Sequence, residues 1–95
     1  MKNLLPSVDL LEKTHAFPSP YLFKIIGNAD EGFVARVIAI VREELAIDVE
    51  PPYRLREAVG GRHISVTLEP VVQSGHQVIA IYRRLSALDD LVMLF

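Results

Sequence analysis

Two arginines at alternate positions carry the clearest chemical signal in this sequence of 95 residues. Arg54 and Arg56 lie in a segment typical of a β-strand, so both guanidinium groups emerge on the same face. Arginine suits a planar carboxylate because its donors match both oxygens at once. The predicted sheet brings further polar side chains to this face, and the candidate set is Lys24, Arg54, Arg56, His63, Ser65 and Thr67. The set predicts a surface for a carboxylate ligand or a protein partner, with a solvated sheet face as the alternative.

No catalytic or metal-binding motif accompanies this set. His15, His63 and His76 share no ligand spacing, so the sequence predicts no metal site. Ser65 and His63 could join a C-terminal aspartate in a catalytic triad, but no sharp nucleophile turn is present. Neighbouring acidic side chains diverge, and no glycine-rich phosphate loop occurs. We therefore expect a protein that is not an enzyme and takes no cofactor.

The composition predicts one small globular domain. Hydrophobic residues make up 51% of the chain, which is enough for a core, and 95 residues leave no room for a second one. A net charge of -2 without a basic run argues against nucleic-acid binding, and the lack of cysteine excludes disulfides. No stretch approaches the roughly 20 apolar residues of a membrane span, and the N-terminus does not resemble a signal peptide. We expect a cytoplasmic protein that binds no membrane.

The first half of the chain predicts a strand followed by a helix. Residues 21–26 are aromatic or β-branched, and Gly27-Asn28 predicts the turn that ends this strand. If Lys24 points to solvent, its two neighbours point to the core. Asn28 and Glu31 resemble a capping box, and apolar residues recur behind it at helical spacing until about residue 46.

The second half predicts a hairpin, a helix and a strand. Gly60-Gly61 suits a two-residue turn between strands at 53–59 and 62–70. In the resulting register Tyr53 lies opposite Leu68, and both strands alternate together. A capping box of Ser74 and Gln77 starts the second helix, which ends before the acidic pair at 89–90. Residues 91–95 form the last strand.

This order of elements is βαββαβ, which predicts an α+β fold of the ferredoxin-like plait type. Right-handed crossovers give a four-stranded antiparallel sheet, in the order 4-1-3-2, with two helices on one face. Residues 1–19 predict a short N-terminal arm, and residues 20–95 the domain. Within the arm, Ser7 could cap a helix through Thr14 that docks by Leu10 and Leu11.

The run from Phe17 to Gly27, F-P-S-P-Y-L-F-K-I-I-G, resembles the YbeD-like family of small bacterial proteins. The resemblance extends from Leu11 to Phe95 and includes the later helices and the glycine-turn hairpin. It implies an ACT-like plait without assigned catalytic residues, described as a regulator linked to lipoate metabolism. ACT domains bind amino acids at the loop between the first strand and first helix, where this sequence has Glu31 in place of a proline.

Two functions stay open on the sequence. The first is a regulatory or adaptor domain that acts by protein–protein interaction, including pairing with itself as a homodimer through an open sheet edge. The second is a sensor of a small carboxylate such as an amino acid, lipoate or octanoate. The functional surface is either the open sheet face or the loop at 27–32.

Overall fold

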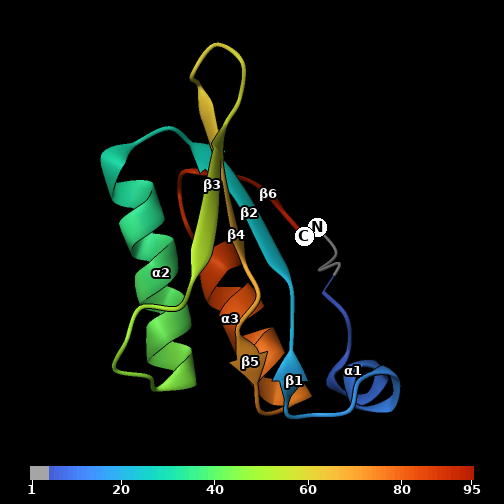
Figure 1. The fold of residues 1–95 in the computed structure, drawn as a ribbon. Helices are drawn as coiled ribbons and strands as arrows, with labels where there is room; N and C mark the ends of the chain where they lie inside the picture. Colours follow the sequence, from blue (N-terminus) through green and yellow to red (C-terminus); the bar gives the residue numbers. More distant parts are fainter. Residues whose placement is uncertain (1–4) are drawn as a thin grey trace.

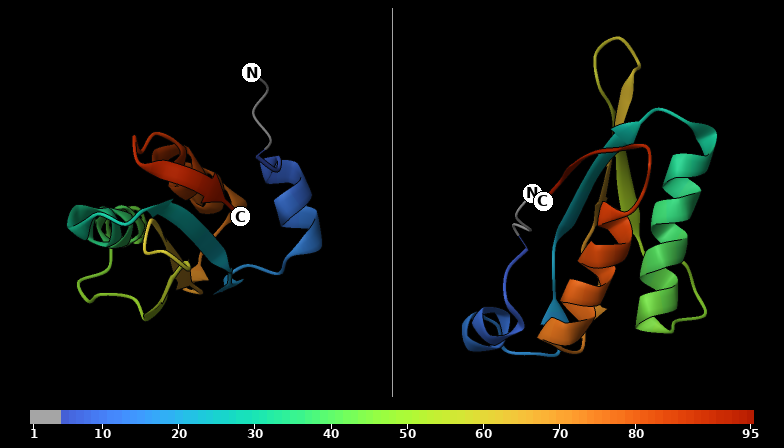
Figure 2. Two further views of the ribbon diagram at one scale, coloured as in Figure 1. Left: turned by 90° about the horizontal axis from the view of Figure 1, so that it is seen from above. Right: turned by 180° about the vertical axis from the view of Figure 1, so that it is seen from behind.

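The computed structural model describes residues 5–95, and a four-stranded antiparallel sheet with two long helices on one face forms its body (Figure 1). The body contains β2 (Phe23–Asn28), α2 (Glu31–Leu45), β3 (Tyr53–Glu57), β4 (His63–Leu68), α3 (Gly75–Ser86) and β6 (Leu91–Leu94). The strand order is β3-β4-β2-β6, which is the predicted order 4-1-3-2 read from the opposite edge. Seen from behind, α2 and α3 cover one face of the sheet, so the other face stays open (Figure 2). The predicted α+β class is confirmed.

Apolar side chains of the sheet and of both long helices meet in one core. Phe23 and Ile25 of β2 are fully buried while Lys24 between them is exposed, as the alternation predicts. Each helix contributes one apolar face, and the fully buried helix residues are Phe33, Val37, Val41, Val78, Ile81 and Leu85. The core therefore lies on the helix side of the sheet, and side chains on the other side remain available for binding.

The junction between β2 and α2 differs from the sequence prediction. Gly27 and Asn28 continue β2 by pairing with β4, so the turn predicted there is wrong. The helix N-cap is Asp30, whose carboxylate accepts a hydrogen bond from the Gly32 N–H at 3.0 Å, so the capping box predicted at Asn28 is also wrong. The strand runs on because Gly27 leaves room for the Phe33 ring, which a Cβ at position 27 would overlap.

The β3–β4 hairpin has the predicted register but a larger loop. Tyr53 pairs with Leu68, and the rest of the ladder follows in step. The Ala58 N–H donates to the His63 carbonyl at 2.9 Å, so residues 59–62 form the loop and the predicted two-residue turn is wrong. Gly60 and Gly61 have φ angles of 92° and 70°, which glycine adopts without steric cost. Two adjacent glycines permit several loop lengths, so the dipeptide marks the place of the loop and not its size.

The second long helix begins as predicted. The Ser74 hydroxyl accepts a hydrogen bond from the Gln77 N–H at 3.2 Å. The Gln77 side chain in turn accepts from the Gln73 N–H at 2.8 Å, one residue before the expected partner. The helix ends at Ser86, before the acidic pair but two residues short of Leu88, the last residue of the predicted helix face.

The N-terminal segment packs against the body through a short helix, α1 (Val8–Thr14). Ser7 caps this helix by accepting from the Leu10 N–H at 3.0 Å, which confirms the predicted cap. Leu11 is buried in the core, whereas Leu10 is exposed, so only one of the two leucines docks. The Glu12 carboxylate accepts a hydrogen bond from the Gly75 N–H, which links α1 to the start of α3.

A second, two-stranded sheet was not predicted. It pairs β1 (Ser19–Pro20) with β5 (Val71–Val72) in antiparallel register. Strands of two residues are too short to show an alternating pattern, which is why the sequence gives no sign of them. β1 thus precedes the segment predicted as the first strand, residues 21–26, and β2 begins at Phe23, two residues later than expected.

Candidate functional site

The open face of the sheet carries all six residues of the predicted binding set, here called the basic face. Cross-strand pairing sets them in rows: β2 supplies Lys24, β4 supplies Thr67 beside it, and β3 supplies Arg54 at the edge. One step along the sheet, Ser65 pairs with Arg56. His63 pairs with Asn28 near the hairpin end. The register predicted from sequence therefore places the set correctly.

The basic face contains two shallow hollows, each lined by different residues of the face. The first has a volume of about 190 Å³, and its lining includes Lys24, Ile26, Arg56, His63 and Ser65. The second, of about 260 Å³, is lined by Pro52, Tyr53, Arg54, Thr67 and Glu69. Both are smaller than the 300–1,000 Å³ typical of pockets for drug-sized ligands. The surface suits a docked segment or a very small ligand.

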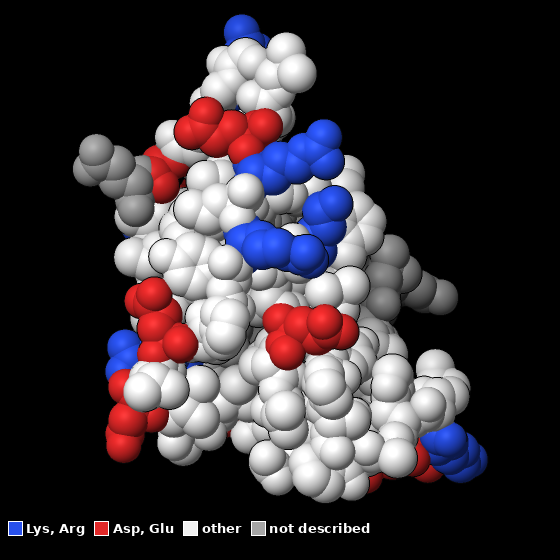
Figure 3. Space-filling view, viewed as in Figure 1, with Lys and Arg blue, Asp and Glu red and all other residues white. Residues whose placement is uncertain are grey.

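The three cations of the basic face have no side-chain partner in the described part of the chain. Among the side chains that the structure describes, those of Lys24, Arg54 and Arg56 make no hydrogen bond or ion pair, although Glu57 and Glu69 are among the residues that line the hollows. Figure 3 shows Lys and Arg side chains gathered in the middle of this side of the molecule, with acidic side chains above and below them. Their charge is thus available to an incoming anion.

Other arginines of the protein are used differently. Arg84 of α3 reaches back to α2, where it contacts the carboxylates of Glu43 at 2.7 Å and Glu44 at 3.1 Å. These carboxylates raise the pKa of Arg84, with Glu43 the larger cause. The ion pairs hold the two helices together, whereas nothing comparable engages the basic face.

The last strand adds an apolar border that sequence reasoning missed. Met93 pairs with Ile26, and Phe95 exchanges two backbone hydrogen bonds with Lys24, at 3.1 and 2.8 Å. Residues opposite each other in an antiparallel ladder share a face, so both side chains border the basic face. They are 49% and 57% exposed. The final five residues are all apolar, so their pattern does not show which side chains lie on the open face. Pairing them with the first strand would have assigned Met93 and Phe95 to it.

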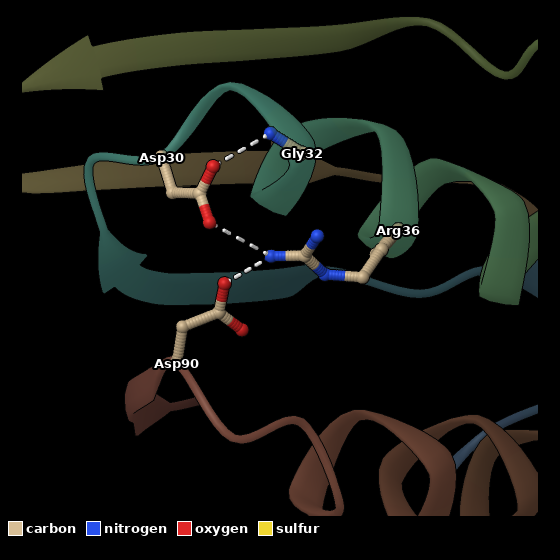
Figure 4. Close-up of polar contacts among 4 residues, drawn as sticks. All are labelled: Asp30, Gly32, Arg36 and Asp90. Atoms are coloured by element: carbon tan, nitrogen blue, oxygen red, sulfur yellow. Dashed lines mark hydrogen bonds and ion pairs between the residues drawn. The ribbon is translucent and has the colours of Figure 1, made fainter.

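Polar contacts among Asp30, Gly32, Arg36 and Asp90 hold the loop at 27–32 (Figure 4). Arg36 of α2 lies 3.4 Å from the Asp30 carboxylate and also contacts Asp90, which precedes β6. The Gly32 N–H and then the Arg36 guanidinium lower the pKa of Asp30, while Asp90 is the larger cause of the raised pKa of Arg36. Two carboxylates already neutralise the one cation here, so the loop has no free positive group for a ligand carboxylate.

The described part of the chain offers neither a metal site nor a membrane-spanning helix. No group of three or more histidines, aspartates or glutamates whose side chains the structure describes is arranged to hold a metal ion. No helix within residues 5–95 is long and apolar enough to cross a membrane. The basic face is therefore the strongest candidate site.

Comparison with known proteins identifies the family. A UPF0250 protein of Shewanella woodyi is 32% identical over 73 residues, which are 77% of this chain and 81% of that protein. A UPF0250 protein of Shewanella amazonensis is 30% identical over the same shares. The solution structure of protein HP0495 from H. pylori has a TM-score of 0.68 at 14% identity, covering 99% of this chain and 98% of that one, which is a likeness of fold alone. The two UPF0250 relatives confirm the expected resemblance to the YbeD-like family. Since residues 12–95 match the family described as protein of unknown function DUF493, the chain belongs to that family.

Proposed function

We propose that this chain is a non-enzymatic regulatory or adaptor domain that binds an acidic segment of a partner protein through the basic face. The observation that carries the proposal is the set of three cations, Lys24, Arg54 and Arg56, which have no side-chain partner among residues 5–95. Charged hydrogen bonds to carboxylates are worth about 1.5–3 kcal/mol each, and more when the contact excludes water.

The apolar border supports a protein partner over a free ion. Met93 and Phe95 are about half exposed beside Lys24, and burial of their exposed parts adds on the order of 1 kcal/mol each. Charged contacts weaken with salt, whereas apolar contacts do not. A partner that uses both would bind with an affinity that falls, but does not vanish, as salt is raised.

The test is affinity capture from the cells that make this protein, with two matched double variants. Arg54→Ala/Arg56→Ala removes two charges from the basic face. Lys13→Ala/Arg83→Ala removes two exposed charges from α1 and from α3, neither of which belongs to this face. We expect the wild type and the second variant to capture the same partner protein in equal amounts. The first variant should capture at least tenfold less of it. Equal capture by all three proteins would contradict the proposal.

A carboxylate sensor is the second candidate, favoured by the first hollow. Lys24 and Arg56 lie there beside the aliphatic side chain of Ile26, a combination that suits a short fatty acid such as octanoate or lipoate. Titration of ¹⁵N-labelled protein with octanoate, lipoate and amino acids tests this reading and with it the link to lipoate metabolism. Saturable shifts at Ile26 and Ser65 that disappear in Lys24→Ala/Arg56→Ala would support it. Shifts that are equal in the variant would count against it.

A further inference from the structure

The outer strand β3 is open on its edge and on both faces. All five of its residues are exposed, and it pairs only with β4, on its inner side. Proteins commonly protect such edges with proline, charge or a covering element. Here Pro51 and Pro52 precede the strand, but Tyr53–Glu57 itself is uncovered.

The backbone groups on the free edge can be assigned from the ladder. The Ala58 N–H donates to the His63 carbonyl, so Ala58 faces β4. Because backbone groups alternate along an antiparallel strand, those of Arg54 and Arg56 also face β4. The N–H and C=O groups of Tyr53, Leu55 and Glu57 therefore point to the open edge.

The side chains beside this edge differ between the two faces. Arg54 and Arg56 lie on the open face and have no ion pair within residues 5–95. Tyr53 and Leu55 lie on the helix side, yet they remain 38% and 48% exposed because α2 packs mainly against α3 and β2. Between Tyr53 and α2 runs a groove of about 430 Å³, which is lined by Val34, Ala35, Ile38, Ala39, Arg42, Glu50 and Tyr53. The open face of the edge favours acidic residues, and on the helix side Tyr53, Leu55 and the aliphatic part of the groove favour apolar ones, although Arg42 and Glu50 also line the groove.

We propose that β3 accepts an extended segment of a partner protein as a fifth strand, in which acidic and apolar residues alternate. The acidic residues would lie beside Arg54 and Arg56, and the apolar residues beside Tyr53 and Leu55 over the groove. Ladder hydrogen bonds from the free edge supply affinity, and the alternating side chains supply specificity. This inference rests on the proposed function and names the form of the acidic segment.

A second copy of the chain fits this edge less well. In a two-fold antiparallel pairing of β3 with itself, the open faces of both copies lie on the same side of the joined sheet. Residues opposite each other then share a face, so their numbers are both even or both odd. Each register centred on Arg54, Leu55 or Arg56 then places two arginines opposite one another. Like charges directly opposite destabilise a strand pair. The same arginines that repel a second copy attract an acidic strand.

The experiment uses the full chain and an eight-residue peptide of alternating Glu and Val with blocked ends. Two further peptides carry N-methyl groups on the Val residues only or on the Glu residues only. In an antiparallel fifth strand the Val N–H groups point to β3, so we expect methylation of Val to weaken binding at least tenfold and methylation of Glu to have little effect. A parallel strand reverses the two results, and either pattern supports the inference.

NMR titration at low salt gives both the affinity and the place of binding. We expect the Tyr53, Leu55 and Glu57 amides to gain protection from hydrogen exchange, and a Lys-Val peptide to bind at least tenfold more weakly. Binding that is equally insensitive to both methylations, with shifts confined to Lys24 and Ser65, would overturn the fifth strand but leave the basic face as the site. Absence of peptide binding, or a β3-dependent dimer in sedimentation, would also overturn the fifth strand. The proposed function would then still be tested separately by the capture experiment.

Discussion

Gly27 shows how one residue sets the geometry behind the basic face. A Cβ at this position would overlap the Phe33 ring, which is itself fully buried at the start of α2. We expect Gly27→Ala to destabilise the fold by about 1–3 kcal/mol, as overpacking of a core does. Urea unfolding measures the change in the free energy of unfolding.

A double-mutant cycle supplies the control for this prediction. Phe33→Leu alone should be destabilising because it leaves a cavity. If the ring is what opposes a methyl group at position 27, Gly27→Ala should cost less in the Phe33→Leu background than in the wild type. Strictly additive effects would show that the two positions do not interact.

Asp30 makes a prediction about pH. The Gly32 N–H and then the Arg36 guanidinium hold the pKa of Asp30 below its ordinary value of 3.8. A lowered pKa in the folded state contributes stability above the unfolded value, and this contribution is lost as the pH falls through the folded value. We expect wild type to be more stable than Asp30→Asn at pH 7, with the difference shrinking below about pH 4.

Thermal unfolding of both proteins across pH 2–7 measures this difference. Asparagine is also a good N-cap, so Asp30→Asn retains the cap and removes only the charge. A difference that stays constant down to pH 2 would mean that the charge of Asp30 plays no part in stability.

At the scale of elements, the docking of α1 depends on one of two adjacent leucines. Leu11 is buried against the body and Leu10 is exposed. We expect Leu11→Ala to lower the free energy of unfolding by about 2–5 kcal/mol, as truncation of a buried leucine does. Leu10→Ala is the matched control and should change it by less than about 0.5 kcal/mol. Equal effects of the two substitutions would show that α1 does not dock through Leu11.

The elements that could be predicted from sequence are those with a long regular pattern. The β3–β4 register was predictable because both strands alternate in step around Gly60-Gly61, and α3 because Ser74 caps an apolar stripe. The extent of β2 was not, because its last two residues, Gly27 and Asn28, are usual turn formers. The strand continues there through pairing with β4, and Gly27 leaves room for the Phe33 ring; both contacts are tertiary.

The candidate site was predictable to the same extent. Its six polar residues follow from the register of three strands. The border of Met93 and Phe95 does not, since a run of apolar residues at the end of the chain has no polar position to mark its faces. The exposure of Tyr53 and Leu55 depends on where α2 lies, which no pattern within β3 encodes.

At the scale of the whole molecule, net charge conceals the uneven placement of charges. The chain carries -2 overall, yet three cations without partners among residues 5–95 gather on one sheet face. Helices cover the other face, and acidic residues engage arginines mainly at the helix ends. One side of the sheet is therefore packed against the helices, and the other side carries cations that have no partner in the described part of the chain.

Lysine footprinting of the protein in complex with the captured partner is the most direct test of whether the partner binds the basic face. Lys24 lies in the basic face, whereas Lys13 lies on α1, where it pairs with Asp9. Acetylation rates of both residues, read by mass spectrometry with and without the partner, therefore contain their own control. We expect the partner to slow acetylation of Lys24 at least fivefold and to leave the rate at Lys13 unchanged. Equal rates at Lys24 with and without the partner would contradict it.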